Sequence, residues 1–102
     1  MIIVKKETDD FEKLVSSGLV VVDVFAPWCA PCKILGPNIE HVVNELGVNL
    51  VKVNSDDNLD LVTKYSVMSV PTLLIFKDGS LIDKKVGNME ILELKKWIES
   101  NL

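Results

Sequence analysis

Runs of apolar residues alternate along the chain with segments of helical periodicity. Ile2–Lys5 is expected to form a short first strand, and Leu19–Phe25 is apolar throughout except for Asp23. A continuous apolar run of this length is typical of a strand that is buried on both faces of a sheet. The pattern therefore predicts that Leu19–Phe25 is the central strand.

Two helices are expected in the first half of the chain. The first follows N-cap candidates at residues 8–10 and stops at Gly18. The second starts at Pro31, presents one apolar stripe and stops at Gly47. Pro37 lies inside this second helix, and we expect a kink there because proline lacks the backbone N–H and crowds the preceding turn.

The second half of the chain adds a hairpin and two more helices. A helix is expected over Leu59–Tyr65 after a cap at residues 56–58, and a last helix starts at about Met89. Residues 77–80 contain Asp-Gly at their centre, which is a hairpin signal. The remaining strands are expected at Val48–Val53, Thr72–Phe76 and Leu81–Val86.

The resulting order is β-α-β-α-β-α-β-β-α, which predicts an α/β fold with a central mixed sheet and helices on both faces. The alternating first part implies parallel strands with crossover helices, and the hairpin adds antiparallel pairing. No repeat and no Pro/Gly/Ser-rich linker interrupts the 102 residues. We therefore expect one domain over residues 1–102.

Charge and hydropathy argue against two classes of partner. The net charge is −4, from 15 acidic and 11 basic residues, and the basic residues are scattered, whereas nucleic-acid binding needs a concentrated basic face. No stretch approaches the ~20 apolar residues of a membrane span. The first residues, Met1–Lys6, lack the pattern of a signal peptide. We expect a cytoplasmic protein that binds neither nucleic acid nor membrane.

The chain contains two cysteines, Cys29 and Cys32, three positions apart. In a reducing compartment such a pair is more often redox-active or metal-bound than a structural disulfide, and the small loop that it closes constrains the unfolded chain little. Structural zinc takes four Cys or His ligands, whereas this chain adds only one distant histidine, His41. Redox chemistry without a metal or another bound cofactor is therefore expected.

The position of the pair suits thiol–disulfide exchange, because it lies between a buried strand and a helix, where sites form in open α/β sheets. A free cysteine is mostly protonated at neutral pH. Unpaired N–H groups and the helix dipole favour the thiolate of Cys29, and Lys33 adds positive potential. Cys32 falls in the first helical turn, which Pro31 suits. We expect Cys32 to be more buried and to attack the mixed disulfide that Cys29 forms.

The segment from Trp28 to Lys33, Trp-Cys-Ala-Pro-Cys-Lys, resembles the active-site motif of the thioredoxin family. The resemblance extends over essentially the whole chain. It includes Asp23 before the motif, Pro37 in the helix, Val70-Pro71-Thr72 before a strand, Phe76-Lys77-Asp78-Gly79 in the hairpin and Val86-Gly87 after it. A Cys-x-x-Cys spacing alone is a weak signal, whereas this set of motifs in this order is specific.

The resemblance assigns roles to residues around the pair. It implies that Cys29 is the nucleophile, that Cys32 is the resolving thiol, and that Asp23 is a buried carboxylate that moves a proton to or from Cys32. Lys52 matches the lysine that neighbours this carboxylate, although an ordinary exposed strand lysine is nearly as common. Pro71 matches a cis-proline facing the disulfide, whereas only ~5–6% of such bonds are cis without that context.

The role of Asp23 also makes physical sense without the resemblance. An anion inside an apolar strand is costly to bury, so the pKa of Asp23 should rise. A carboxyl group with a raised pKa beside a thiol is suited to general acid/base work near neutral pH. The ordinary reading, in which Asp23 only ends the strand or faces water, fits poorly with its apolar neighbours.

The resemblance also implies a shallow apolar groove for the substrate. In it, the backbone of Val70 would pair with an extended substrate segment. Met68 and Ser69 precede this position and are further candidates for substrate contact. The residues implied in substrate binding are Trp28, Ala30, Pro31, Val70, Pro71 and Gly87.

The function implied by the resemblance is reduction of protein disulfides by a monomer that an NADPH-dependent thioredoxin reductase recharges. The alternatives are an oxidant or isomerase on the same fold, a glutaredoxin-like protein, and a scaffold subunit that uses the fold rather than the thiols. Pro31 favours reduction, because oxidants of this fold usually carry His directly before the second cysteine. Thioredoxins commonly have Gly where this chain has Ala30, so the redox potential stays open.

Overall fold

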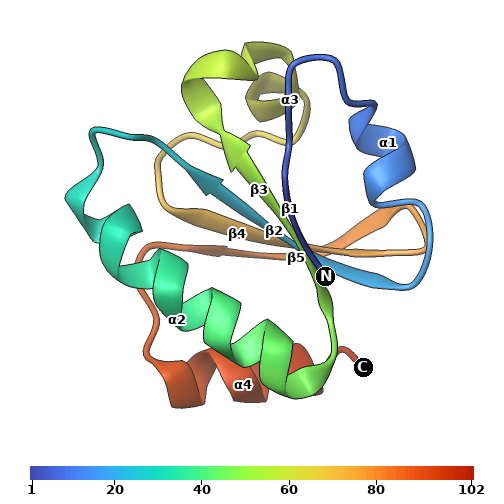
Figure 1. Ribbon diagram of the computed structural model, residues 1–102, viewed down its shortest axis with the longest axis vertical. Coiled ribbons are helices and arrows are strands. Elements are labelled where there is room, and N and C mark those ends of the chain that lie inside the picture. The colour runs from blue at the N-terminus through green and yellow to red at the C-terminus, as the bar shows by residue number, and fades with distance from the viewer.

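The five strands form one mixed sheet in the computed structural model, which describes residues 1–102 (Figure 1). Their order across the sheet is β1–β3–β2–β4–β5, so that β2 is central, as predicted. β3 pairs in parallel with β1 and β2, whereas β4 pairs antiparallel with β2 and β5. The strands are β1 Ile2–Val4, β2 Leu19–Phe25, β3 Asn49–Asn54, β4 Thr72–Lys77 and β5 Ser80–Val86.

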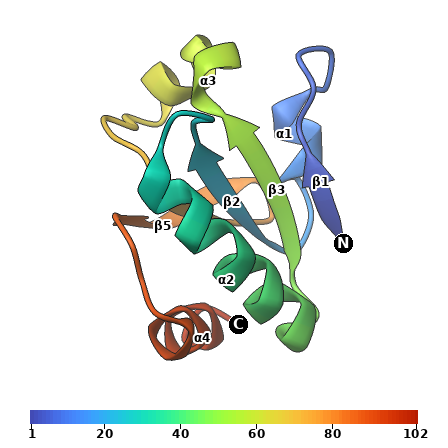
Figure 2. The same cartoon turned by 60° about the vertical axis from the view of Figure 1, so that its left-hand side comes forward.

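Helices cover both faces of the sheet. α2 and α4 lie on one face, and α1 and α3 lie on the other (Figures 1 and 2). This arrangement confirms the predicted α/β class and the order of elements, with one short 3₁₀ turn added between β3 and α3. The helices are α1 Phe11–Leu14, α2 Ala30–Leu46, α3 Leu59–Lys64 and α4 Ile91–Glu99.

Residues of β2 alternate between two hydrophobic cores. Val20, Val22 and Val24 pack on the side of α1 and α3, whereas Val21 packs on the side of α2 and α4. Because successive strand residues point to opposite faces, Asp23 lies on the same face as Val21, under α2. Burying each valine contributes roughly 1.5–3 kcal/mol. This is why the apolar run becomes the central strand.

α2 begins and ends at residues that suit helix termini. Cys29 is its N-cap, and Gly47 follows it at a φ of 69° and donates its backbone N–H to the Val43 carbonyl. A left-handed φ is cheap for glycine, which has no Cβ. Pro37 lies inside the helix, which continues through it. Even α2, with 17 residues, does not reach the combination of length and apolar character needed to cross a membrane.

The predicted cap before α3 is right in its position: Asn58 is the N-cap residue, although its side chain makes no cap bond to the helix. The preceding residues, Ser55–Asp57, form a 3₁₀ turn, and Asn54 caps that turn by accepting a hydrogen bond from the Asp56 N–H at 3.0 Å. The Asn58 side chain donates to the Asn54 carbonyl and accepts from Lys5 Nζ at 2.7 Å. The polar side chains therefore tie this turn to the N-terminal segment.

The β4–β5 hairpin turns at Asp78 and Gly79, which have φ values of 48° and 88°. Two successive positive φ values are typical of the type I′ turn that Asp-Gly favours. The Gly18 N–H donates to Asp78 Oδ1 at 2.8 Å, and the Asp78 N–H donates to the Gly18 carbonyl at 3.0 Å. A register irregularity lies between Ile75 and Phe76, where β4 faces β5.

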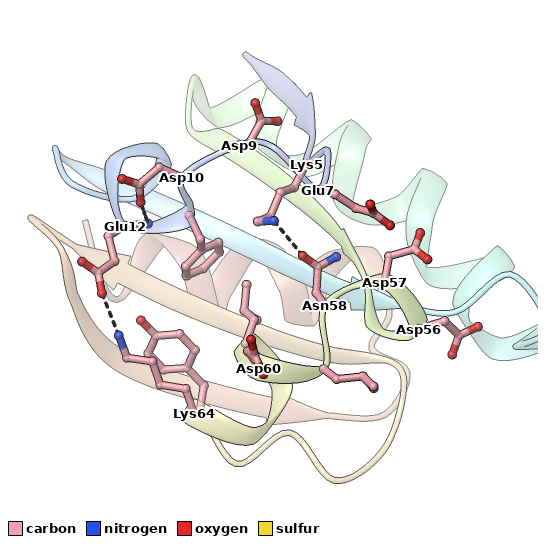
Figure 3. A pocket seen from close by; sticks show the side chains of 14 residues that line it. Lys5, Glu7, Asp9, Asp10, Glu12, Asp56, Asp57, Asn58, Asp60 and Lys64 are labelled. Carbon is pink, nitrogen blue, oxygen red and sulfur yellow. Dashed lines mark hydrogen bonds and ion pairs between the residues drawn. The ribbon is translucent and has the colours of Figure 1, made fainter.

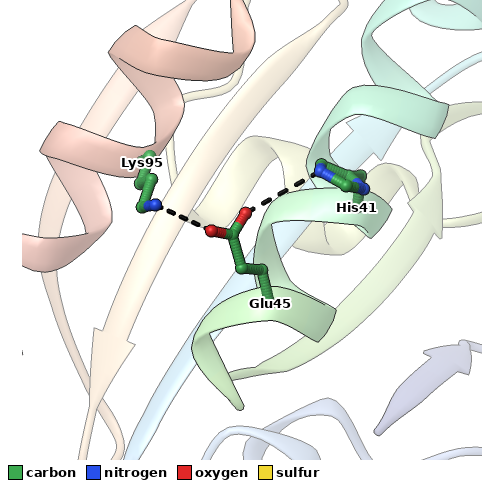
Figure 4. A network of polar contacts seen from close by, with 3 residues as sticks. All are labelled: His41, Glu45 and Lys95. Atoms are coloured by element: carbon green, nitrogen blue, oxygen red, sulfur yellow. Dashed lines mark hydrogen bonds and ion pairs between the residues drawn. The ribbon is translucent and has the colours of Figure 1, made fainter.

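α4 is fastened to the sheet and to α2 by polar contacts. Trp97, which is buried, donates its Nε1–H to Asp83 Oδ2 on β5 at 2.6 Å. On the surface, Glu45 of α2 pairs with Lys95 of α4 at 2.7 Å and with His41 of its own helix at 3.7 Å (Figure 4). The His41 side chain is 63% exposed, as expected for a surface residue.

Candidate active site

The cysteine pair lies where β2 leads into α2, beyond the carboxyl end of the central strand. Cys29 and Cys32 form a disulfide, with their Cα atoms 5.3 Å apart. Cys29 Sγ also accepts a hydrogen bond from the backbone N–H of Cys32 at 3.2 Å. The sulfur of Cys29 therefore takes the position of a helix N-cap acceptor, where N–H groups and the helix dipole stabilise negative charge.

The two cysteines are almost equally buried, at 4% and 6% exposure, so the expectation that Cys32 is the more buried one is wrong. Both pack in one small apolar cluster with Ala26, and Phe25 and Val70 lie against it. Accessibility therefore does not distinguish the two sulfurs, whereas hydrogen bonding does, because Cys29 Sγ accepts the bond from the Cys32 N–H.

Asp23 is a buried carboxylate without a partner. It is 1% exposed, and neither of its side-chain oxygens has a hydrogen bond. Burial raises the pKa of Asp23 to about 6, against the lowering effect of Lys52 and with a smaller raising effect of Glu40. The predicted rise is confirmed, and its main cause is the loss of hydration of the charged form.

Lys52 lies directly beside Asp23 in the register of β2 and β3. Its side chain is 21% exposed, so it is not an ordinary surface lysine. The ammonium lies 5.5 Å from the centre of the Phe25 ring and 3.2 Å from Glu40 Oε2 on α2. Lys52 therefore neighbours the buried carboxylate, as the resemblance implied, but forms its ion pair with Glu40.

The Val70–Pro71 peptide bond is cis, which confirms the expectation for Pro71. Pro71 is buried, and its carbonyl accepts a hydrogen bond from the Gly87 N–H at 2.9 Å. Gly87 has a φ of 89°, a conformation that residues with a Cβ rarely adopt. Val70 packs against the cysteine cluster, so this turn is adjacent to the disulfide.

An apolar groove of about 240 Å³ opens beside the disulfide. Trp28, which is 71% exposed, forms part of its wall and donates its Nε1–H to Asp56 Oδ2 at 3.1 Å. Pro71 and Gly87 do not line this groove. Pro71 directly follows Val70, which does line it, and Gly87 is bonded to the Pro71 carbonyl. The lining residues are Trp28, Ser55, Leu59, Val62, Val67, Met68, Ser69 and Val70.

A larger cavity than this groove lies between the N-terminal segment, α1 and α3, and neither cysteine lines it (Figure 3). Its volume is about 630 Å³. Lys64 pairs there with Glu12 at 2.8 Å. No group of three or more His, Cys, Asp or Glu side chains is placed to hold a metal ion. The carboxylates of this cavity are Glu7, Asp9, Asp10, Glu12, Asp56, Asp57 and Asp60.

A cysteine pair at the N-terminus of a helix, joined by a disulfide and next to a cis-proline, is the site of a thiol–disulfide oxidoreductase. The sequence model of the family described as Thioredoxin matches residues 2–100. Thioredoxins of Bacillus subtilis and Staphylococcus aureus are each 43% identical over 104 residues, with 100% of this chain and of the relative covered. The chain belongs to the thioredoxin family.

Solved structures agree with this assignment. A mutant thioredoxin from Halobacterium salinarum superimposes with a TM-score of 0.90 at 31% identity, covering 97% of this chain and 88% of its own. The reduced thioredoxin of Schistosoma mansoni also gives 0.90 at 31% identity, covering 99% and 98%. The protein is therefore an oxidoreductase that acts on protein disulfides through a redox-active cysteine pair.

Two residues at the site were not found from the sequence alone. Glu40 lies eight positions after Cys32 and four after Gly36, so the three share one face of α2. That periodicity is the signal that could have pointed to Glu40. The sequence indicates Asp56 only as a helix-cap candidate, because nothing along the chain shows that a residue 28 positions away bonds to Trp28.

Proposed function

We propose that the chain reduces disulfides of other proteins, with Cys29 as the attacking thiolate and Cys32 as the resolving thiol. The observation that carries this assignment is the hydrogen bond from the Cys32 N–H to Cys29 Sγ at the start of α2. It gives Cys29, and not Cys32, a donor that stabilises a thiolate. Ionised sulfur is the form that attacks a disulfide.

The reaction proceeds by two exchanges. The Cys29 thiolate attacks one sulfur of the substrate disulfide, the substrate S–S bond breaks, and its second sulfur leaves as a thiolate that takes a proton. Cys32 then loses its proton and attacks Cys29 Sγ, which breaks the mixed disulfide and releases the first substrate sulfur. Two electrons pass from the dithiol to the substrate, and Cys29–Cys32 becomes a disulfide.

Asp23 is the proton acceptor for Cys32 in this scheme. With a pKa of about 6, its carboxyl group is mostly ionised at pH 7 and still protonates readily. A base works best when its pKa is close to the operating pH. The absence of any hydrogen bond to its oxygens leaves both free to accept the thiol proton, directly or through a water molecule.

The substrate docks over the disulfide on the surface formed by Trp28, Val70, Pro71 and Gly87. Trp28 and Val70 line the apolar groove, and Val70 also packs against the cysteine cluster, which supports docking at this position. An extended segment can add main-chain hydrogen bonds there, which gives affinity without demanding one sequence. Ala30 and Pro31 are exposed between the cysteines and complete this surface.

The oxidised chain is recharged by an NADPH-dependent thioredoxin reductase, in the cytoplasm, and works as a monomer without a bound cofactor. The fold and the full-length similarity to bacterial thioredoxins support this cycle. Pro31 before Cys32 supports reduction rather than oxidation of substrates. A histidine at this position would stabilise the thiolate further and so make the disulfide more oxidising.

Trapping tests the roles of the two cysteines. Cys32→Ser should accumulate a covalent mixed disulfide with a test protein that carries one exposed disulfide, whereas Cys29→Ser should accumulate none. Mass spectrometry under non-reducing conditions reads both outcomes. A stable adduct on Cys29→Ser, or none on Cys32→Ser, would reverse or remove the assignment.

Equilibration in glutathione redox buffers tests the direction of electron flow. If Ala30 leaves the couple strongly reducing, the disulfide should persist in all but very reducing buffer. Every 30 mV of reduction potential corresponds to about 1.4 kcal/mol for this two-electron couple. Ready reduction by glutathione would instead place the protein among the oxidants or glutaredoxin-like proteins.

A further inference from the structure

Three ionisable side chains lie between the sheet and α2. Asp23 and Lys52 are neighbours in the register of β2 and β3, and Glu40 lies above them on the helix. The Lys52 ammonium is 3.2 Å from Glu40 Oε2, and it would be 3.5 Å from a Cβ placed on Gly36. Lys52 is therefore turned toward α2, against the turn of the helix that follows Cys32.

The turned lysine leaves Asp23 without a direct partner. No ammonium lies within ion-pair distance of the Asp23 carboxylate, and neither of its oxygens accepts a hydrogen bond. The neighbour of Asp23 on β4 is the apolar Leu73. The charged side chains that act on this carboxylate are thus Lys52 from β3 and Glu40 from α2.

We propose that Glu40 is a positioning residue for the redox reaction: its carboxylate holds the Lys52 ammonium on the α2 side, so that Lys52 does not close onto Asp23. This inference rests on the proposed function, in which Asp23 takes the proton of Cys32. A carboxylate held in a close ion pair is a weaker base, and such a pair typically lowers its pKa by 1–3 units. Burial raises the pKa of Asp23 to about 6, and the Glu40–Lys52 contact prevents a close ion pair with Lys52 from cancelling that rise.

Both consequences of removing the Glu40 charge act in the same direction. A negative charge near Asp23 is lost, and the lysine loses the partner that turned it away. Each makes the ionised form of Asp23 more favourable. The direct effect of the charge is the same whether or not Lys52 is present, whereas the positioning effect needs Lys52, so the two can be separated by a double-mutant cycle.

Glu40→Gln is the variant to test, because it keeps the size of a side chain that is 37% exposed. The titration of Asp23 is followed by the ¹³C chemical shift of its carboxyl carbon in the oxidised, full-length protein. We expect the midpoint to fall below about 6. The matched control is Glu45→Gln, which removes the same charge from the same helix at a side chain that is 43% exposed and bonded to Lys95. The control should leave the Asp23 midpoint unchanged.

The cycle is completed with Lys52→Met and with the double variant. Lys52→Met should raise the Asp23 midpoint, and Glu40→Gln should lower it by less in the Lys52→Met background than in the original protein. Equal shifts in the two backgrounds would mean that Glu40 acts only through its own charge and would overturn the positioning role. An unchanged or raised midpoint in Glu40→Gln alone would overturn it as well.

The pH profile of disulfide reduction links this arrangement to catalysis. The part of the pH profile in which the rate rises as Asp23 ionises should shift to lower pH in Glu40→Gln, by the same amount as the NMR midpoint of Asp23. Asp23→Asn separates the two hypotheses. If that variant keeps the profile of the original protein, the proposed proton transfer through Asp23 is wrong. If Asp23→Asn abolishes this rise in rate while Glu40→Gln leaves its midpoint unchanged, only the role of Glu40 is wrong.

Discussion

The backbone N–H of Cys32 donates to the sulfur of Cys29 at 3.2 Å, so the first turn of α2 holds the side chain that caps it. Because the two cysteines are almost equally buried, this contact is the main local difference between them. In the reduced protein, Cys29 should react with iodoacetamide at pH 7 roughly ten-fold faster than Cys32 or more, since the thiolate is the reactive form. Peptide mapping after brief alkylation measures the ratio, and equal labelling would contradict the assignment.

The raised pKa of Asp23 predicts that the stability of the folded protein falls as the pH rises. Its pKa is about 6 in the folded protein and 3.8 in an unperturbed chain. A group whose pKa is raised by folding contributes stability that is fully present below the unfolded value and is lost as the pH rises through the folded value. The difference corresponds to about 3 kcal/mol at about 1.4 kcal/mol per pH unit. The loss falls between about pH 4 and pH 7.

Asp23→Asn removes this titration while keeping the shape of the side chain. The free energy of unfolding of the variant, relative to the original protein, should therefore rise by about 3 kcal/mol between pH 3.5 and pH 8. Urea unfolding of the oxidised proteins, followed by circular dichroism, gives the difference at each pH. A difference that stays constant over this range would show that Asp23 titrates as an exposed carboxyl group does.

The bond from Trp97 Nε1–H to Asp83 Oδ2 predicts a local contribution to stability. Asp83→Ala leaves the donor of a buried indole without a partner, which should cost about 1–2 kcal/mol in unfolding free energy. The hydrogen bond from Trp97 lowers the pKa of Asp83 in the folded protein. The bond therefore stabilises the fold fully at pH values above the pKa of Asp83 in the unfolded chain, and this stabilisation is lost as the pH falls through the lower pKa of the folded protein. Glu7→Ala, at an exposed carboxylate, is the control. Equal unfolding midpoints for the two variants would contradict this prediction.

Trp28 predicts an effect on substrate binding rather than on stability. Its exposed indole is held by the carboxylate of Asp56, so Asp56→Ala frees the ring to adopt other rotamers. Loss of one such bond should raise KM by about two- to five-fold, with kcat and thermal stability unchanged. Asp57→Ala removes the neighbouring charge without touching the indole and should leave KM as it is. Matching increases in both variants would indicate a charge effect instead.

Local patterns predicted most of the fold. Leu19–Phe25 was bounded correctly at both ends because its apolar run is interrupted by nothing but Asp23, and the turn at Asp78 was marked by the residue pair that tolerates positive φ. The cap position at Asn58 follows from the sequence, whereas its hydrogen bonds do not, since Asn58 has several polar neighbours and nothing local decides which of them it bonds. Competing local bonds of this kind are settled by the tertiary fold.

The site was predicted in its chemistry more fully than in its contacts. The cis bond at Pro71 followed from the resemblance and not from local physics, which favours trans. The partner of Lys52 depends on how far α2 reaches over β3, and no pattern along the chain fixes that distance. The same holds for the burial of Cys32, since Val70, which packs against the cysteine cluster, lies far from it along the chain.

The β5 edge, one of the two edges of the sheet, has a consequence for behaviour at high concentration. β5 has a strand neighbour on one side only, and a free strand edge can pair with the same edge of another molecule and grow into an aggregate. Lys84 and Lys85 are exposed on this strand, and the irregularity at Ile75 and Phe76 disturbs the flat ladder that stacking requires. The β5 edge should therefore stay unpaired in a crowded solution, where a regular, uncharged edge would seed fibrils.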